Sequence, residues 1–361
     1  MPIRVGLSVV VLVLALAGFG CSRSVFGQDK SSQEGAFHSQ VDLVSVYFTV
    51  RDDKKRLASD LAQDKFSVSE DGQPQVIKLF AHHSDVVLNV GVLLDTGTIM
   101  SWILGEEAQA AKLFMKHVVR PTDLGFILSY ASRVETVQLP TSDVALLEEK
   151  ADTVGGGEAA IGLPEQEQAQ EPGVSMPGGG GTVGINGRPV NQNREAHLYD
   201  AIRVSSLRYL AGEVGRKAVV IVALSGDSRS ESSLQEALEA LLENDVIAYV
   251  LQIYDASKRD NCDVLHIYQE DGHGESLPKK LAEATGGRML EVRGMGKLEA
   301  ALDEISDELH HQYSLGYYPE NKNWDGKFRK IQISAGEKAY KVYARKGYYA
   351  NPPTEKVAAT H

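Results

Sequence analysis

The feature that most constrains the fold is an unbroken apolar run, VVLNVGVLLD, which spans residues 86–95 and ends in Asp95. A strand buried on both faces of a parallel sheet has such a run, whereas a half-exposed strand alternates apolar and polar residues. Four more apolar strand patterns follow, at residues 124–132, 217–226, 245–254 and 288–293. Helical apolar spacing occurs at residues 101–119, 196–212, 233–244, 276–287 and 297–312. Five strands that alternate with five helices predict an α/β fold with a doubly wound, mostly parallel sheet.

Strand patterns also flank this α/β part, which we place at residues 85–311. VDLVSVYFTVRD (residues 41–52) has one fully apolar face, and residues 65–80 form two strand patterns around the turn Glu70-Asp71-Gly72. The β pattern returns after His311 in YSLGYYP, FRKIQIS and YKVYARKGYYA. We therefore expect an N-terminal β region at 38–84 and a C-terminal β extension at 312–350, followed by a loose tail at 351–361. The two β regions flank the same core and could pack together.

The N-terminus has the pattern of an export signal. Arg4 precedes an apolar stretch at residues 5–17, which is too short to span a bilayer of ~30 Å comfortably. Cleavage before Gln28 would give a signal peptide at 1–27 and a flexible lead-in at 28–37, with no transmembrane helix in the mature chain. Acylation of Cys21 is the alternative, although Gly18-Phe19-Gly20 lacks the aliphatic residue of a lipobox. We expect an exported protein, either periplasmic, at the cell surface or secreted.

Charge and cysteine content exclude some classes of protein. The net charge is -12 and no block of Lys and Arg stands out, which argues against a nucleic-acid partner. The chain has only two cysteines, Cys21 and Cys262, so the fold does not depend on an intrachain disulfide once the signal is removed.

Residues 155–193 interrupt the α/β rhythm. They are rich in Gly, Pro, Gln and Glu and lack apolar periodicity, so we predict a disordered surface insertion within the α/β part. Its PGGGGTVG stretch has no preceding strand and no Gly-Lys-Ser/Thr ending, which a phosphate-binding loop requires.

Asp95-Thr96-Gly97 matches the motif of aspartic proteases. In those enzymes two such loops place two carboxylates together, so that one acts as acid and the other as base. This chain has no second Asp-Thr/Ser-Gly, and a helix follows Asp95 instead of a strand. A dimer that contributes one loop from each chain remains a remote alternative.

The chain resembles the von Willebrand factor type A (VWFA) related proteins common in Acidobacteria. The resemblance rests on VDLVSVYFTVRD, FSVSEDGQPQVI, LYDAI, RKAVVIVALSGD, ELHHQYSLGYYP, FRKIQI and ARKGYYA, which together extend over nearly the whole mature chain. It implies a Rossmann-like VWFA domain that binds a partner protein at the carboxyl ends of its strands, with no catalysis. In this family a hard cation such as Mg²⁺ often completes the binding site.

The metal-ion-dependent adhesion site implied by the resemblance is degenerate here. Asp95 matches the first position of its Asp-x-Ser-x-Ser motif, but the two Ser positions hold Gly97 and Ile99, and Ala196 or a neighbour stands where the metal Thr belongs. The later acidic loop has Gly226-Asp227 in swapped order. If a cation does bind, the candidate ligands are Asp95, Thr96, Thr98 and Asp227. We expect no cofactor, and a partner-binding surface of Thr96, Gly97, Thr98, Met100, Asp227 and Ser228.

Three function hypotheses therefore stay open: a metal-independent protein-protein interaction module, cation-dependent adhesion through Asp95, and a dimeric aspartic protease. Structural roles are the simpler expectation for the individual acids. Asp95 would cap the loop and the helix that follow it, Asp227 would help to start the next helix, and Asp200 would lie in the first turn of its own helix.

Other metal and sugar sites have weaker support. Cys262, His266 and His273 lack the tight ligand spacing of zinc sites. Adjacent histidines at 82–83 and 310–311 point in diverging directions, so neither pair is expected to share a metal. The C-terminal tyrosines fit sheet packing better than a sugar-binding platform.

Overall fold

The computed structural model describes residues 43–83, 86–96, 101–154, 196–223, 227–254, 277–293, 295–336 and 340–352. The expected signal peptide, the lead-in, Cys21, the insertion at 155–193, and Cys262 with its neighbouring histidines lie outside these residues. Within them, no helix is both long and apolar enough to span a membrane.

The central sheet has six strands in the order β10-β9-β8-β5-β6-β7. Its strands are β5 (Leu88–Asp95), β6 (Leu124–Tyr130), β7 (Val134–Thr141), β8 (Arg216–Ala223), β9 (Val246–Tyr254) and β10 (Met289–Arg293). All neighbouring pairs are parallel except β6 and β7, which are antiparallel. Every residue of β5 is buried, as its unbroken apolar run predicts. The predicted doubly wound, mostly parallel α/β fold is confirmed.

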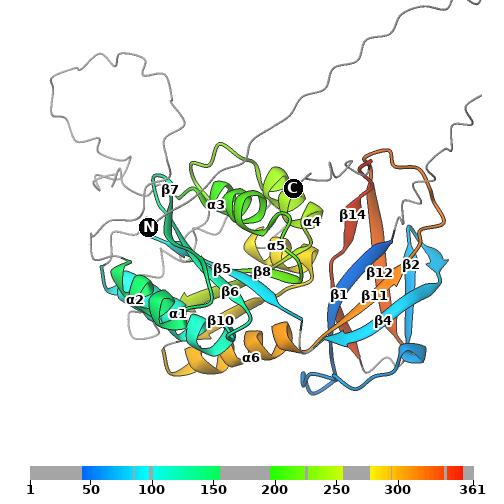
Figure 1. Cartoon of the computed structure of the whole chain (residues 1–361), viewed down its shortest axis with the longest axis horizontal. Helices are drawn as coiled ribbons and strands as arrows, with labels where there is room; N and C mark the ends of the chain where they lie inside the picture. The colour runs from blue at the N-terminus through cyan, green and yellow to red at the C-terminus, as the bar shows by residue number, and fades with distance from the viewer. Residues whose placement is uncertain are drawn as a thin grey trace, which may run out of the picture. The chain divides into compact units, whose positions relative to one another are not determined.

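Helices cover both faces of this sheet (Figure 1). One face packs against α1 (Ser101–Val118), α2 (Val144–Thr153) and α6 (Leu298–His310). The other face packs against α3 (Leu198–Val204), α4 (Leu234–Glu243) and α5 (Leu277–Thr285). A π-helical segment, Ser205–Leu210, continues α3. Gly212 follows with a φ of +83°, a conformation that favours glycine, and the chain leaves the helix there.

The sequence predicted five strands and five helices for the α/β part, one strand and one helix fewer than the structure describes there. It missed β7 and α2, which follow β6 directly. β7 is the antiparallel edge strand and pairs with β6 through an irregular register. The signal for α2 was present, because the Asp143 side chain accepts a hydrogen bond from the Leu146 amide at 3.1 Å and so forms an N-cap.

The remaining strands form two antiparallel four-stranded sheets, in the orders β13-β1-β11-β4 and β14-β12-β2-β3. They are β1 (Val44–Arg51), β2 (Phe66–Glu70), β3 (Gln73–Gln75), β4 (Ile77–His83), β11 (Gln312–Tyr317), β12 (Phe328–Ala335), β13 (Lys341–Ala344) and β14 (Gly347–Tyr349). Each sheet mixes N-terminal and C-terminal strands, and the two sheets share one core. Phe48, Phe66 and Tyr313 form its aromatic centre, with ring centroids 5.2–5.4 Å apart. We refer to this part as the sandwich.

The sandwich is attached to the α/β part at the amino ends of the parallel strands, which we call the amino edge. Arg345 pairs with Asp245, just before β9, and donates to the Ser45 carbonyl at 2.7 Å. The Lys346 amide donates to the Ala284 carbonyl at 2.9 Å, in the last turn of α5. Contacts also run along α4, where the Gln235 amide group donates to the Tyr349 hydroxyl at 2.6 Å.

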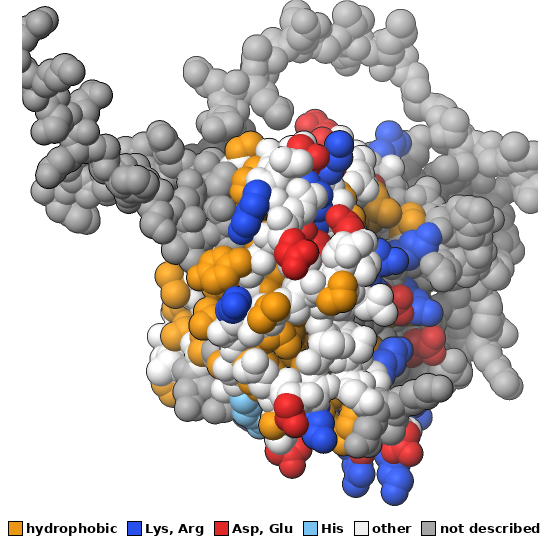
Figure 2. Space-filling view, turned by 90° about the vertical axis from the view of Figure 1, so that its right-hand side faces the viewer, with side chains coloured by type: hydrophobic (Ala, Val, Ile, Leu, Met, Phe, Trp, Pro, Cys, Tyr) orange, Lys and Arg blue, Asp and Glu red, His pale blue; other side chains and the backbone are white. Residues whose placement is uncertain are grey.

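On the face shown in Figure 2, basic and acidic side chains are interspersed.

Candidate interaction surface at the carboxyl edge

The carboxyl ends of β5, β8, β9 and β10 lie at one edge of the sheet, because these strands are parallel. Open α/β sheets bind their ligands at this edge. We call it the carboxyl edge and define it by Asp95 and Thr96, the start of α3 at residues 196–200, and the loop at residues 227–232. The predicted partner-binding residues that the structure describes, Thr96, Asp227 and Ser228, belong to it.

Asp95 ends β5 and is fully buried. The next residue, Thr96, remains joined to the neighbouring strand, since its amide donates to the Tyr130 carbonyl at 3.0 Å. The other predicted residues of this segment, Gly97, Thr98, Ile99 and Met100, lie outside the described residues.

Asp227 caps the start of α3. Its carboxylate accepts a hydrogen bond from the Tyr199 amide at 3.1 Å and another from the Ser230 hydroxyl. The expectation that Asp227 starts the next helix, α4, was therefore wrong. Ser233 has that role, through a capping box in which its side chain and the side chain of Glu236 each accept from the other's backbone amide. Local sequence does not show that Asp227 caps a helix whose Tyr199 amide lies 28 residues earlier in the chain.

The loop and the start of α3 are also joined through Ala196 and Ser228. The Ala196 amide donates to the Ser228 hydroxyl at 3.0 Å, and the Ser228 amide donates to the Ala196 carbonyl at 3.0 Å. The structure thus brings together Ser228, from the predicted partner-binding surface, and Ala196, from the position of the missing metal Thr. Here Ala196 contributes its backbone to the site.

Asp200 connects α3 to the loop in the opposite direction, from the helix to the loop. The sequence pattern did not predict this connection. Its carboxylate accepts hydrogen bonds from the amides of Glu231 and Ser232, both at 3.0 Å. His197 Nδ1 lies 3.1 Å from the same carboxylate. Burial acts to raise the pKa of Asp200, but the hydrogen bonds from Ser232, His197 and Glu231 outweigh it and hold the pKa below its ordinary value. Asp200 is therefore charged under ordinary conditions and fixes the loop.

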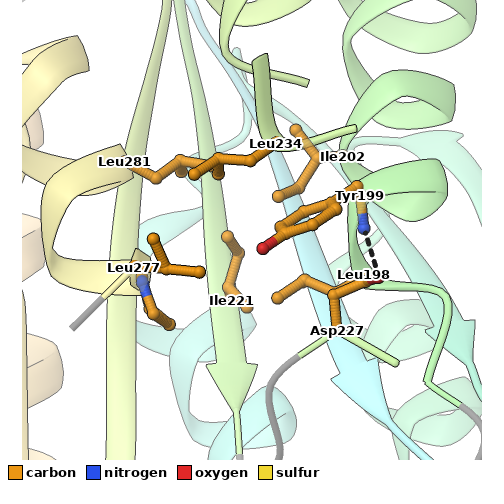
Figure 3. Close-up of a pocket in the computed structure, with 9 residues that line it drawn as sticks. Leu198, Tyr199, Ile202, Ile221, Asp227, Leu234, Leu277 and Leu281 are labelled. Atoms are coloured by element: carbon orange, nitrogen blue, oxygen red, sulfur yellow. Dashed lines mark hydrogen bonds between the residues drawn. The ribbon is translucent and has the colours of Figure 1, made fainter. Parts of the chain in front are cut away.

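An apolar hollow lies beside this network, between α3 and α5 (Figure 3). The Tyr199 side chain points into it over Ile221 of β8, and Asp227 lies at its margin. Burial, and then the charge of Asp227, raises the pKa of Tyr199 to about 12, so the phenol stays protonated and can donate a hydrogen bond. The rest of the lining is aliphatic: Leu198, Ile202, Leu234, Leu277, Pro278 and Leu281.

The two acids of this network make structural contacts. The carboxylates of Asp200 and Asp227 both hold backbone amides, as helix caps and loop anchors do. Within the part of the chain that the structure describes, no three His, Cys, Asp or Glu side chains are placed to hold a metal ion together.

No family model and no curated protein matches the chain. Among solved structures, a von Willebrand factor type A protein from Catenulispora acidiphila is similar at 9% identity and a TM-score of 0.42, over 88% of this chain and 76% of that one. The conserved hypothetical protein BatB from Bacteroides thetaiotaomicron is similar at 13% identity and a TM-score of 0.39, over 62% of this chain and 97% of that one.

Proximal thread matrix protein 1 from the mussel byssus is similar at 12% identity and a TM-score of 0.40, over 63% of this chain. That match spans about half of the mussel protein, 49% of its length. These solved neighbours thus include von Willebrand type A domains, at identities and scores too low to assign a function.

Proposed function

We propose that this protein is an exported, non-enzymatic protein-protein interaction module that binds its partner at the carboxyl edge without a metal ion. The observation that carries the proposal is the hydrogen-bond network between residues 227–232 and the start of α3. It commits two carboxylates to backbone amides and holds two surface segments in one arrangement. A surface fixed before binding loses less conformational freedom when it binds.

The position of the sandwich is a second argument for the carboxyl edge as the binding surface. The sandwich is attached at the amino edge and along α4, through Arg345 and Tyr349. The carboxyl edge is the opposite end of the same strands, which is where open α/β sheets bind ligands.

Photo-cross-linking in the native host tests the proposal. A photo-reactive phenylalanine replaces Arg229, an exposed residue of the loop, and the matched control carries it at Lys322, an exposed residue of the sandwich. We expect a discrete cross-linked partner from position 229 alone, with the same yield in EDTA. Equal products from both positions would contradict the proposed surface, and loss of the product in EDTA would favour cation-dependent adhesion instead.

The two remaining parts of the proposal have their own tests. Mass spectrometry of the protein from the native host is expected to show a chain that begins at Gln28, and a lipid-modified Cys21 would point to an anchored form. The remote alternative, a dimeric aspartic protease, predicts peptide cleavage that Asp95→Ala abolishes, whereas the proposed module predicts no cleavage by either protein.

A further inference from the structure

Two histidines that are 229 residues apart in the chain lie side by side where the chain crosses between the sandwich and the α/β part. His82 is on β4, one residue before the strand ends and the chain continues toward β5. His311 is the single residue between α6 and β11. Their ring centroids are 6.4 Å apart, and the ring planes are inclined by 25°.

Strand pairing explains why these two rings meet. His82 is paired with Tyr313 of β11, and its ring lies 5.2 Å from the Tyr313 ring. His311 is two residues before Tyr313, so both project on the same side of the strand. His310 is buried and turns the other way, with its Nδ1 2.8 Å from the Ser306 carbonyl. His310 and His311 thus diverge, as expected, and His311 instead lies beside His82 across the strands.

The hydrogen bonding of His311 prepares it as a metal ligand. Its Nδ1 lies 2.9 Å from the Asp307 carbonyl oxygen, which can only accept, so Nδ1 carries the proton and donates it. Nε2 then has a free lone pair. A histidine oriented by a backbone carbonyl through its other nitrogen is the usual arrangement at protein metal sites.

His82 has complementary properties. It is exposed to solvent, so an ion can reach it. Burial of part of the ring, and then the nearby His311, lowers the pKa of His82 below its ordinary value. A lowered pKa favours the neutral ring, which is the form that binds a metal.

We propose that His82 and His311 form a surface site for a transition-metal cation, Zn²⁺ or Cu²⁺. With metal-nitrogen distances of ~2.0–2.1 Å, two imidazoles on one ion have ring centres roughly 5–6.5 Å apart, a range that includes the 6.4 Å between these two rings. Imidazole ligands suit Zn²⁺ and Cu²⁺, whereas Mg²⁺ and Ca²⁺ require oxygen. Water fills the remaining positions, and the affinity is expected to be micromolar.

A bound ion would tie together the two connections between the sandwich and the α/β part. β4 leads into β5, and α6 leads through His311 into β11. Because only the folded chain brings the two rings together, metal binding stabilises the folded state by mass action. The thermal unfolding midpoint is therefore expected to rise with metal concentration.

Calorimetric titration of the untagged protein with ZnCl₂ and with CuSO₄ tests the site. The variants are His82→Ala and His311→Ala, and the matched control is His117→Ala, which removes another partly exposed histidine, one that pairs with Asp303. We expect each site variant to lose one equivalent of saturable binding that the control keeps. Residues 255–276 contain Cys262, His266 and His273, and any binding there is common to all four proteins.

Electron paramagnetic resonance of the copper complex adds a readout that a merely structural role would not change. The parent protein and His117→Ala are expected to show two-nitrogen coordination that both site variants lack. The proposal is overturned if no saturable binding occurs up to 1 mM metal, if all four proteins bind alike, or if only one of the two site variants loses the equivalent.

Discussion

Different kinds of interaction stabilise the two edges of the parallel sheet. At the carboxyl edge, the carboxylates of Asp200 and Asp227 and the hydroxyl of Ser228 accept hydrogen bonds from backbone amides. At the amino edge, buried charged side chains bind one another. One edge thus holds two surface segments in a fixed arrangement, and the other joins the sandwich to the α/β part through ion pairs.

The amino edge contains a four-residue ion network. Arg51 of β1 lies 2.8 Å from Glu304 and donates from Nε to Glu308 at 2.8 Å, both on α6. Arg288, before β10, lies 2.7 Å from Glu304 and 2.6 Å from Glu308. The Glu308 side chain is 1% exposed and that of Arg51 is 8% exposed, so water cannot replace a lost partner.

The largest effect is expected from Glu308→Ala. It would leave the buried Arg51 and the partly buried Arg288 with reduced compensation, and breaking a buried pair costs about 3–5 kcal/mol. Urea denaturation would measure the loss in the free energy of unfolding. Glu304→Ala is the matched control, because its side chain is 37% exposed and exposed pairs contribute about 0–1 kcal/mol. Equal losses from the two substitutions would mean that burial does not distinguish this edge.

Asp200→Ala is expected to have the next largest effect. The amides of Glu231 and Ser232 would lose their acceptor, at a cost of about 1–3 kcal/mol in unfolding free energy. The same denaturation experiment measures it, with Asp303→Ala as an exposed control. Cross-linking from position 229 should also weaken, since the loop loses its fixed arrangement. If the variant is destabilised but cross-links normally, the fixed arrangement of the loop is not required for partner binding.

Ser233→Ala is expected to cost about 1 kcal/mol, the usual contribution of a helix N-cap. It removes the Ser233 hydroxyl, which accepts a hydrogen bond from the Glu236 amide at 3.2 Å at the start of α4, whereas the backbone amide of residue 233 still donates to the Glu236 carboxylate. Because Ser233 follows the loop but makes no contact with Asp200, partner cross-linking should stay unchanged. Reduced cross-linking would extend the binding surface onto α4.

The smallest effect is a difference in acid sensitivity. The folded-state pKa of Asp200 is lowered, so its contribution to stability is present above its unfolded pKa of ~3.9 and is lost as the pH falls through the lower, folded pKa. Asp200→Asn should therefore give a flatter loss of stability below about pH 4. Unfolding midpoints of both proteins between pH 2.5 and 5 would measure this. Parallel curves would show that Asp200 is not the titrating group.

The fold class could be predicted because the apolar patterns that mark strands and helices are local in the sequence. Unbroken apolar runs such as β5 and helical spacing such as α1 identified the α/β class, since burial on both faces leaves a direct mark on the sequence. The edge strand β7 was missed because it is only partly buried and its register is irregular. Its neighbour α2 had a recognisable cap in Asp143 that was overlooked.

The candidate site was less predictable because its contacts are long-range. Asp227 caps α3 through the Tyr199 amide, 28 residues earlier in the chain, and His82 lies beside a histidine that no local pattern connects to it. Asp200 of α3 contacts Ser230 and Glu231, which lie 30 and 31 residues later in the chain. Sequence spacing reports local geometry well, but it does not identify partners that tertiary folding brings together.

The most direct test of the account is calorimetric titration of the protein and of Asp95→Ala with Mg²⁺ and Ca²⁺, two ions that the histidine pair does not suit. We expect no saturable binding by either protein at millimolar concentrations, because the carboxylates of Asp200 and Asp227 hold backbone amides. Saturable binding by the parent protein that Asp95→Ala abolishes would contradict it and would establish a cation-dependent adhesion site.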